Sequence, residues 1–291
     1  MRIIATKLSY SENGDHILSI EKHDESELIR QNIYLHEKIA ISYDTRHNEI
    51  YNDHEQKRLR LSLQDAVASI RSPGARAMDY GCGAGNLTSH LVELGMDVVA
   101  ADVTPSFARI TVSLAPDHVE PFILNGRDLE GVNDDSFDLI ATYSVLHHIP
   151  DYLTAIREMA RVVKPGGIIY LDHEASNEHW NPSLALAEFR SLVKKHHSLS
   201  WYLGRLASPS WWLKKVQKTI NPKYAEEGDI HVWPDDHIEW LAIRNVFAEL
   251  NIEIIRDEPY LLYQPHYGIE EYSKYKGQCS DMHVLVGRKH Q

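Results

Sequence analysis

The chain has 291 residues, of which 43% are hydrophobic and 25% are charged, a composition typical of a globular protein with a large core. The net charge is −12, from 30 Lys and Arg against 42 Asp and Glu. This charge disfavours a protein that binds DNA or another phosphate backbone, because such proteins need a basic surface. The two cysteines, Cys82 and Cys279, exclude a disulfide framework and a metal site built on cysteine, and no metal is expected.

The N-terminal sequence lacks the features of a secretory signal or a membrane anchor. Its apolar run is interrupted at Lys7, and no apolar run in the chain approaches the ~18 residues that a membrane-spanning helix needs. We therefore expect a cytoplasmic protein.

Residues 1–70 differ in pattern from the rest of the chain. Two short strands are predicted at Arg2–Leu8 and His16–Glu21, joined across Asn13-Gly14, a pair that tolerates the positive φ of a hairpin turn. A helical pattern follows as far as about Ile70. We expect this part to form a hairpin and a helical cap.

From Ala75 onward, strand and helix patterns alternate. The predicted strands are Ala75–Tyr80, Asp97–Asp102, Pro121–Leu124, Phe137–Ser144 and Ile168–Asp172. A helix at Tyr152–Val163 is expected to end at Lys164-Pro165-Gly166-Gly167. This alternation predicts an α/β fold with a doubly wound, Rossmann-like, mostly parallel sheet. Such sheets bind ligands at the carboxyl ends of their strands.

The alternation stops after Asp172 and resumes with a helix at Asp235–Leu250 and strands at Ile252–Tyr263 and Met282–Arg288. An insertion therefore interrupts the sheet domain. The expected parts are an N-terminal hairpin and helical cap at 1–70, a Rossmann-like core at 71–175, a lid insertion at 176–233 and the remainder of the core at 234–291.

The insertion is basic and rich in tryptophan. Between Arg190 and Ala225 there are eight basic residues and no acidic one, which leaves −20 on the remainder, and five of the six tryptophans lie between 176 and 233. A helix over Trp211–Ile220 is expected to begin after Ser208-Pro209. It would pack on the sheet domain, contact an anionic membrane or a lipid-linked acceptor as a lid, or bind nucleic acid.

The turn after the first predicted strand carries the strongest functional signal. Asp79–Asn86 reads DYGCGAGN, and its alternate glycines allow a tight turn in which a ligand lies against bare amides at a helix N-terminus. The spacing differs from the GxGxxG of dinucleotide sites, and Asp79 would repel a pyrophosphate but suits an ammonium group. Asp102, at the end of the next strand, is placed to hydrogen-bond a ribose. A nucleoside with a cationic amino-acid tail fits this pair better than NAD does.

These segments resemble class I S-adenosylmethionine-dependent methyltransferases of the broad type 11 group. The resemblance covers about residues 75–175 and leaves 1–70 and 176–233 outside it. The matching segments, in chain order, are Ala77–Gly85, Ala101–Pro105, Asn133–Ile140, Ser144–Ile149 and Val162–Gly167.

The resemblance implies S-adenosyl-L-methionine as the cofactor and assigns residues to its parts. Asp79, Gly81 and Gly83 would hold the methionyl end, Asp102 the ribose, Val103 and Leu129 the adenine faces, Asp128 the adenine amino group, and Ser144 the region near the sulfonium. Tyr43, ahead of the sheet, is either an aromatic lid over the cofactor or a core residue.

We expect methyl transfer to a small-molecule or lipid-linked acceptor, by O- or N-methylation. A base is needed only if the acceptor is a hydroxyl. His173, just past the fifth predicted strand, and His231, in the insertion, are the candidates, placed ahead of a packing pair at His147 and His148. The alternatives are RNA methylation through the basic segment 190–225 and a non-catalytic binding subunit with this fold.

Overall fold

The computed structural model describes the central part of the chain and most of its C-terminal part. The described residues are 4–10, 16–22, 29–30, 33–34, 36–37, 49–70, 74–193, 212 and 237–290, with 4–10 and 16–22 described by their backbone. Tyr43, His231 and nearly all of the basic segment 190–225 lie outside them.

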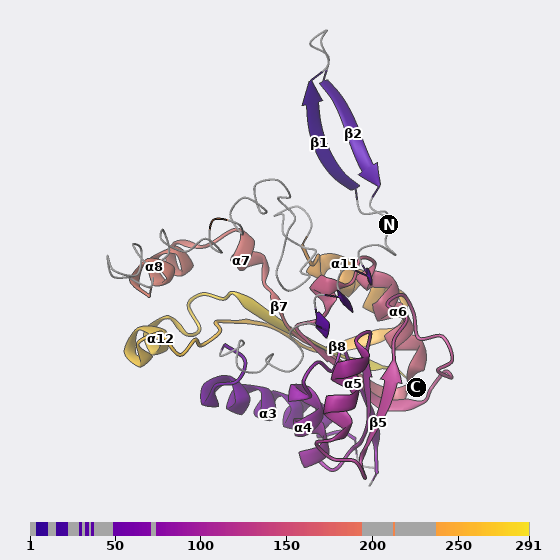
Figure 1. The fold of residues 1–291 in the computed structure, drawn as a ribbon. Coiled ribbons are helices and arrows are strands. Elements are labelled where there is room, and N and C mark those ends of the chain that lie inside the picture. Colours follow the sequence, from indigo (N-terminus) through magenta and orange to yellow (C-terminus); the bar gives the residue numbers. More distant parts are fainter. Residues whose placement is uncertain are drawn as a thin grey trace.

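An antiparallel hairpin lies at the N-terminal end. It consists of β1 (Ile4–Tyr10) and β2 (His16–Lys22), and it stands away from the sheet domain (Figure 1). The strand that we expected at Arg2–Leu8 begins and ends two residues later.

The central sheet has seven strands in the order β5-β4-β3-β6-β7-β9-β8. They are β3 (Arg76–Tyr80), β4 (Asp97–Asp102), β5 (Val119–Ile123), β6 (Phe137–Tyr143), β7 (Val163–Ala175), β8 (Ile252–Tyr260) and β9 (Met282–Lys289). Strands β3 to β7 run parallel, whereas β9 runs antiparallel to both β7 and β8. The expected Rossmann-like, mostly parallel sheet is confirmed. The chain reverses its winding between β3 and β6, which is the switch point where such sheets bind ligands.

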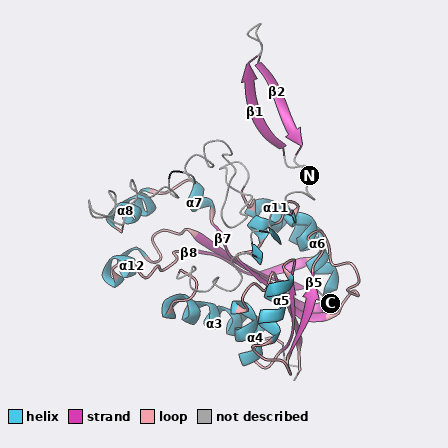
Figure 2. Cartoon of the chain, viewed as in Figure 1, coloured by secondary structure: helices cyan, strands magenta, loops and turns pink. Residues whose placement is uncertain are grey.

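Helices cover both faces of this sheet (Figure 2). They are α3 (Asp53–Val67), α4 (Asn86–Glu93), α5 (Pro105–Val112), α6 (Tyr152–Val162), α7 (Asn177–Trp180), α8 (Leu184–Leu192), α11 (Trp240–Glu249) and α12 (Ile269–Tyr275), with a short 3₁₀ helix at Leu146–His148. Helices α3 and α4 pack on one face, and α6 and α11 pack on the other. None of the helices described here has the length and apolar character needed to cross a membrane.

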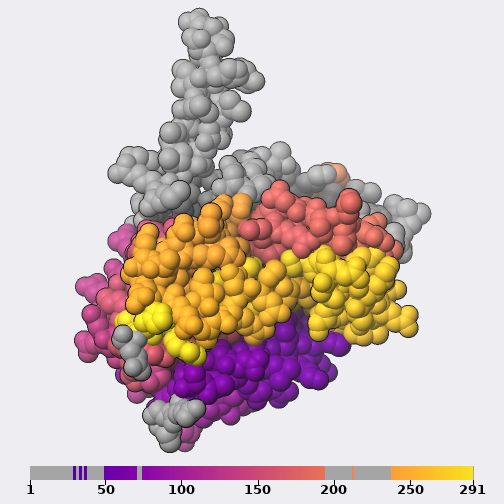
Figure 3. All heavy atoms as spheres, turned by 180° about the vertical axis from the view of Figure 1, so that it is seen from behind, coloured from indigo at the N-terminus to yellow at the C-terminus, as the bar shows by residue number. Residues whose placement is uncertain are grey.

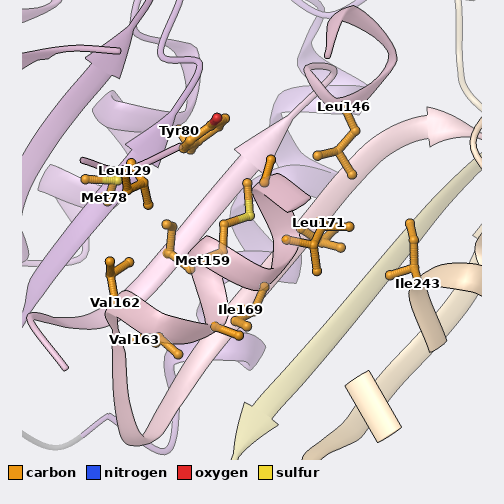
Figure 4. Close-up of a cluster of buried hydrophobic side chains, with 14 of the residues drawn as sticks. Met78, Tyr80, Leu129, Leu146, Met159, Val162, Val163, Ile169, Leu171 and Ile243 are labelled. Carbon is orange, nitrogen blue, oxygen red and sulfur yellow. The ribbon is translucent and has the colours of Figure 1, made fainter. Parts of the chain in front are cut away.

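Strand β7 is buried on both sides. Ile169 and Leu171 face α6 and α11, where Met159 and Ile243 lie close to them (Figure 4), whereas Ile168 and Tyr170 face α3. A strand covered on both faces needs a continuous apolar run, and this explains the sequence IIYL in its centre.

The structure differs from expectation at the start of β7. The segment Lys164-Pro165-Gly166-Gly167 was expected to be a turn before a strand at Ile168, but β7 already begins at Val163, directly after α6. The pairing with β6 shifts register there, from Val163 opposite Phe137 to Ile168 opposite Leu139. The four residues therefore form an irregularity within the strand.

The described part of the insertion packs beside the C-terminal region. Helix α8 lies against α12, a helix that we did not predict, and the two lie side by side on the back of the molecule (Figure 3). Their shared core consists of Leu186, Phe189, Leu261, Tyr272, Tyr275 and Cys279.

Candidate functional site

A cleft opens at the carboxyl ends of β3, β4 and β6, at the switch point of the sheet. It encloses about 710 Å³, its open mouth included. The residues that line it are Ile29, His36, Tyr80, Gly81, Gly83, Asp102, Val103, Phe107, Leu124, Gly126, Tyr143, Ser144, Val145, His148, Ile149 and Pro150.

The glycine-rich turn forms the floor of the cleft. Gly81 has φ +80°, and a Cβ on it would lie 2.5 Å from the methyl carbons of Val145, so the turn and the segment after β6 are in close contact. Gly83 has φ +49°, and a Cβ on it would meet no atom within 4 Å. Glycine is thus required at Gly81 for packing, and at Gly83 it leaves open space for a ligand.

Asp102 joins this turn to the end of β4. Its Oδ2 accepts a hydrogen bond from the amide of Gly83 at 3.0 Å, and its Oδ1 accepts one from the amide of Thr104 at 2.7 Å. The side chain is buried beside the cleft, and burial raises its pKa to about 6 although the two amides act in the opposite direction. The remaining acceptor capacity of the carboxylate is available at the cleft wall.

Asp79 lies one layer deeper than Asp102. It is 1% exposed and does not line the cleft, and its Oδ2 accepts a hydrogen bond from Oγ1 of Thr88 at 2.6 Å. Burial, together with the nearby charge of Asp102, raises the pKa of Asp79 to about 7. Two buried carboxyl groups therefore support the glycine-rich turn from below.

The opposite wall follows β6. Ser144 has a positive φ of 60°, and its amide donates to the carbonyl of Asp172 at 3.0 Å, which turns the chain back across the ends of the strands. The amides of Val145 and Leu146 both donate to Oε1 of Glu174 at 2.7 Å. A buried carboxylate at the end of β7 thus determines the conformation of this wall.

An N-terminal segment lies over the cleft. The ring of His36 lies 5.2 Å from that of His148 and 6.0 Å from that of Phe107, measured between centroids. The carboxylate of Glu37 accepts hydrogen bonds from the amide and the hydroxyl of Ser106, at 3.1 and 2.6 Å. Residues near position 36 therefore contribute to the site although they lie far from the motifs in sequence.

A buried ionic cluster lies behind Tyr143. The hydroxyl of Tyr143 donates to Glu55, and Arg58 donates to both Glu55 and Asp172. The hydroxyls of Tyr170 and Tyr260 also donate to Asp172. Burial raises the pKa of Glu55, but Arg58 and the neighbouring imidazole of His173 outweigh this and hold it at about 2.

The candidate base His173 belongs to this cluster. Its side chain is 5% exposed, and its ring stacks on that of Tyr143 with the centroids 4.5 Å apart. Its Nδ1 lies 3.3 Å from the hydroxyl of Tyr260 and 3.8 Å from Oε1 of Glu55. His173 therefore lies behind the cleft wall and does not line the cleft.

The structure brings five of the predicted cofactor residues together at the cleft: Gly81, Gly83, Asp102, Val103 and Ser144. Asp79, Asp128 and Leu129 do not line it. Leu129 is fully buried in the core, and Oδ1 of Asp128 accepts from Nδ2 of Asn125 at 2.7 Å. Tyr43 and His231 lie outside the described residues.

Several lining residues were not predicted. They include Tyr80, Phe107, Tyr143, Val145 and His148, which lie within or beside the quoted motifs, so their position at or shortly after the end of a strand was an available signal. Ile29 and His36 had no such signal, because only the folding of the N-terminal segment onto the sheet brings them to the cleft.

This lining fits S-adenosylmethionine. Asp102 offers a carboxylate for ribose hydroxyls, and the open space at Gly83 leaves room for a ligand against the turn. Val103, Phe107 and Leu124 supply an apolar surface for an adenine ring.

The comparisons with known proteins concern the same part of the chain. Residues 78–171 match the family model described as "Methyltransferase domain". Ubiquinone biosynthesis O-methyltransferase of Xanthomonas campestris pv. campestris (strain B100) is 35% identical over 114 residues, which are 38% of this chain and 48% of that protein. The protein of the same name from Xanthomonas oryzae pv. oryzae (strain PXO99A) is 36% identical over 114 residues, with the same coverage. The chain thus spans about half the length of these curated relatives.

A solved structure extends the likeness to the fold. The N-methyltransferase NodS from Bradyrhizobium japonicum WM9, in complex with S-adenosyl-L-homocysteine, matches with a TM-score of 0.53 at 14% identity, over 89% of this chain and 100% of that chain. At this identity the similarity shows the fold alone. Residues 78–171 thus match a methyltransferase domain, and the fold of the chain is similar to that of this solved methyltransferase.

Proposed function

We propose that this protein transfers the methyl group of S-adenosylmethionine to a hydroxyl group of a small-molecule acceptor. The observation that carries the proposal is the unit formed by Asp102 and Gly83 at the switch-point cleft, inside the matched domain. This unit presents a carboxylate and a bare backbone at the place where doubly wound sheets bind ligands.

Different residues of the cleft would bind different parts of the cofactor. Asp102 would accept from the ribose, Gly83 would let the ligand lie against the turn, and Val103 would contact the adenine. The bound cofactor supplies an activated methyl group, so the protein mainly has to align donor and acceptor and to exclude water. The N-terminal segment that carries His36 would help to exclude water, since it covers the cleft.

Two observations favour a flat acceptor with a hydroxyl group. The two curated relatives described above carry the name of an O-methyltransferase. The lining of the cleft also includes the aromatic rings of Tyr143 and His148, and such rings suit a planar apolar molecule.

Calorimetry and mass spectrometry test the proposal in two steps. We expect the purified protein to bind S-adenosylmethionine and S-adenosylhomocysteine but not NAD. In the presence of the methyl donor, catechol or 4-nitrocatechol should gain the mass of one methylene unit. An aromatic amine and total RNA serve as competing acceptors. Transfer only to the amine, or only to RNA, would replace the hydroxyl acceptor, and absence of cofactor binding would refute the function itself.

A further inference from the structure

We infer that His147, held by the buried carboxylate of Glu174, takes the proton from the acceptor hydroxyl. The inference rests on the proposed function, because only a hydroxyl acceptor needs a base. It replaces His173 as the candidate base with a residue whose surroundings are better suited to the role.

Glu174 binds three donors of one short segment. Its Oε1 accepts from the amides of Val145 and Leu146, and its Oε2 lies 2.8 Å from Nδ1 of His147. The side chain of Glu174 is fully buried. Burial alone would raise the pKa of this carboxyl, but His147 and the two amides outweigh it and hold the pKa below its usual range.

An ionised carboxylate decides which nitrogen of His147 carries the proton. A carboxylate only accepts hydrogen bonds, so Nδ1 of His147 must donate to Glu174. In the neutral ring, Nε2 is then the atom with the basic lone pair. A buried carboxylate that faces the other nitrogen also stabilises the imidazolium that forms when Nε2 takes a proton.

His147 lies next to the cleft, although it is not itself among the residues that line it. It lies between Val145 and His148, which both line the cleft, and its ring centroid is 4.0 Å from that of His148. Its side chain is 25% exposed. His173, by contrast, is 5% exposed behind Tyr143, and its Nδ1 faces the hydroxyl of Tyr260.

The step conserves atoms and charge. The acceptor oxygen uses a lone pair to form the new O–C bond, and the C–S bond of the donor breaks with its electron pair left on sulfur. The hydroxyl proton goes to Nε2 of His147, which becomes an imidazolium next to the carboxylate of Glu174. The sulfonium charge is thus replaced by a charge that Glu174 stabilises.

The substitution His147→Asn distinguishes a role of His147 as a base from a purely structural role. The Asn amide keeps a donor toward Glu174 but has no basic nitrogen. We expect kcat with catechol to fall by about 10²–10⁴-fold, with the KM for catechol and the Kd for the cofactor unchanged. With 4-nitrocatechol, which is largely ionised near neutral pH, the loss should stay below about tenfold because no base is needed.

A matched control is available on the surface. His118 also has Nδ1 next to a carboxylate, Oδ1 of Asp97 at 3.1 Å, but it lies at the other end of the sheet strands, 60% exposed. His118→Asn should leave the rates with both acceptors unchanged. Glu174→Gln should resemble His147→Asn, because a side-chain amide facing Nδ1 favours the wrong tautomer.

A spectroscopic measurement gives a readout independent of turnover. The absorbance of 4-nitrocatechol reports its ionisation when it is bound to the complex with S-adenosylhomocysteine. The bound phenol should ionise at lower pH in the wild-type protein than in His147→Asn, since the imidazolium stabilises the phenolate.

The outcomes of these experiments distinguish failure of the role of His147 from failure of the proposed function. Equal losses with catechol and 4-nitrocatechol, or unchanged ionisation of the bound phenol, would overturn the role of His147 while methyl transfer by the wild type upholds the proposed function. If the wild-type protein methylates neither phenol, the proposed acceptor class fails, and the inference falls with it.

Discussion

The amide of Gly83 donates a hydrogen bond to Oδ2 of Asp102 across 3.0 Å and so joins the glycine-rich turn to the end of the neighbouring strand. The same carboxylate accepts from Thr104 at the start of α5. One side chain therefore positions the turn after β3 and the helix after β4, and it does so at the wall of the cleft. A change at Asp102 should affect ligand binding more than it affects the fold.

Replacing Asp102 by Asn tests this relationship. Loss of charge-assisted hydrogen bonds worth roughly 1.5–3 kcal/mol should weaken cofactor binding about tenfold or more. Asp97→Asn, at the exposed opposite end of β4, serves as the control and should bind normally. Calorimetry on both proteins, with circular dichroism to verify folding, measures the difference. Equal affinities would remove Asp102 from the site.

The two buried carboxyl groups beneath the turn should make cofactor binding depend on pH. Burial raises the pKa of Asp79 to about 7 and that of Asp102 to about 6, against an unfolded value of 3.8. A cofactor with a positive sulfonium and ammonium group favours the ionised carboxylates. Its affinity should therefore increase as the pH rises through these values, and binding near pH 6.5 should release protons. Calorimetry in buffers of different ionisation enthalpy detects this release, and the Asp79→Asn protein should release less.

The same shifts determine how the stability of the ligand-free protein depends on pH. Because both folded pKa values are raised, the folded protein binds more protons than the unfolded chain between the unfolded value of 3.8 and about 7. These two groups therefore contribute less stability as the pH rises through that window. A free energy of unfolding that falls less steeply in Asp79→Asn would support this account, and an identical pH profile would contradict it.

Gly81 should tolerate no side chain. Gly81→Ala places a Cβ 2.5 Å from the methyl carbons of Val145 at a φ of +80°, so we expect a loss of stability and of cofactor affinity. Gly95 has nearly the same φ, +81°, with no atom within 4 Å of the added carbon. Gly95→Ala should therefore lose only the stability that a side chain at a positive φ costs, about 1–2 kcal/mol. Urea unfolding compares the two, and equal losses would show that contact with Val145 is unimportant.

The ionic cluster behind Tyr143 should be important for stability. Arg58→Met leaves Glu55 and Asp172 buried without their cation, and this should cost about 3–5 kcal/mol of unfolding free energy. Arg157→Met, which breaks an exposed pair with Glu249, should cost at most about 1 kcal/mol. Similar losses for the two variants would contradict a structural role for the buried cluster.

The pKa of Glu55 predicts how this cluster responds to acid. Its folded value of about 2 lies below the unfolded value of 4.5, so its stabilising contribution is complete above 4.5 and is lost as the pH falls toward 2. Acid unfolding of Glu55→Gln should therefore show a shallower dependence on pH in that range than the wild type. Parallel unfolding curves would show that Glu55 is not held in its ionised form by its neighbours.

The sequence by itself determined the sheet and the floor of the cleft. The alternating strand and helix patterns between Ala75 and Asp172 predicted the parallel core, and the motifs located Gly81, Gly83, Asp102 and Ser144. The strands and the glycine-rich turn could be predicted because they depend on local properties. Burial on both faces of a strand leaves a continuous apolar run, and a tight turn against a ligand needs glycine.

Only the tertiary structure decided which polar side chains meet at the ends of the strands. Glu174 lies near the end of β7, yet its three donors lie 27 to 29 residues earlier in the segment after β6. His173, its neighbour, turns instead into a cluster with Glu55 and Tyr143. Such contacts depend on the register between strands and on the packing of α3. No periodicity or spacing in the sequence records them, since one residue of shift exchanges the two faces of a strand.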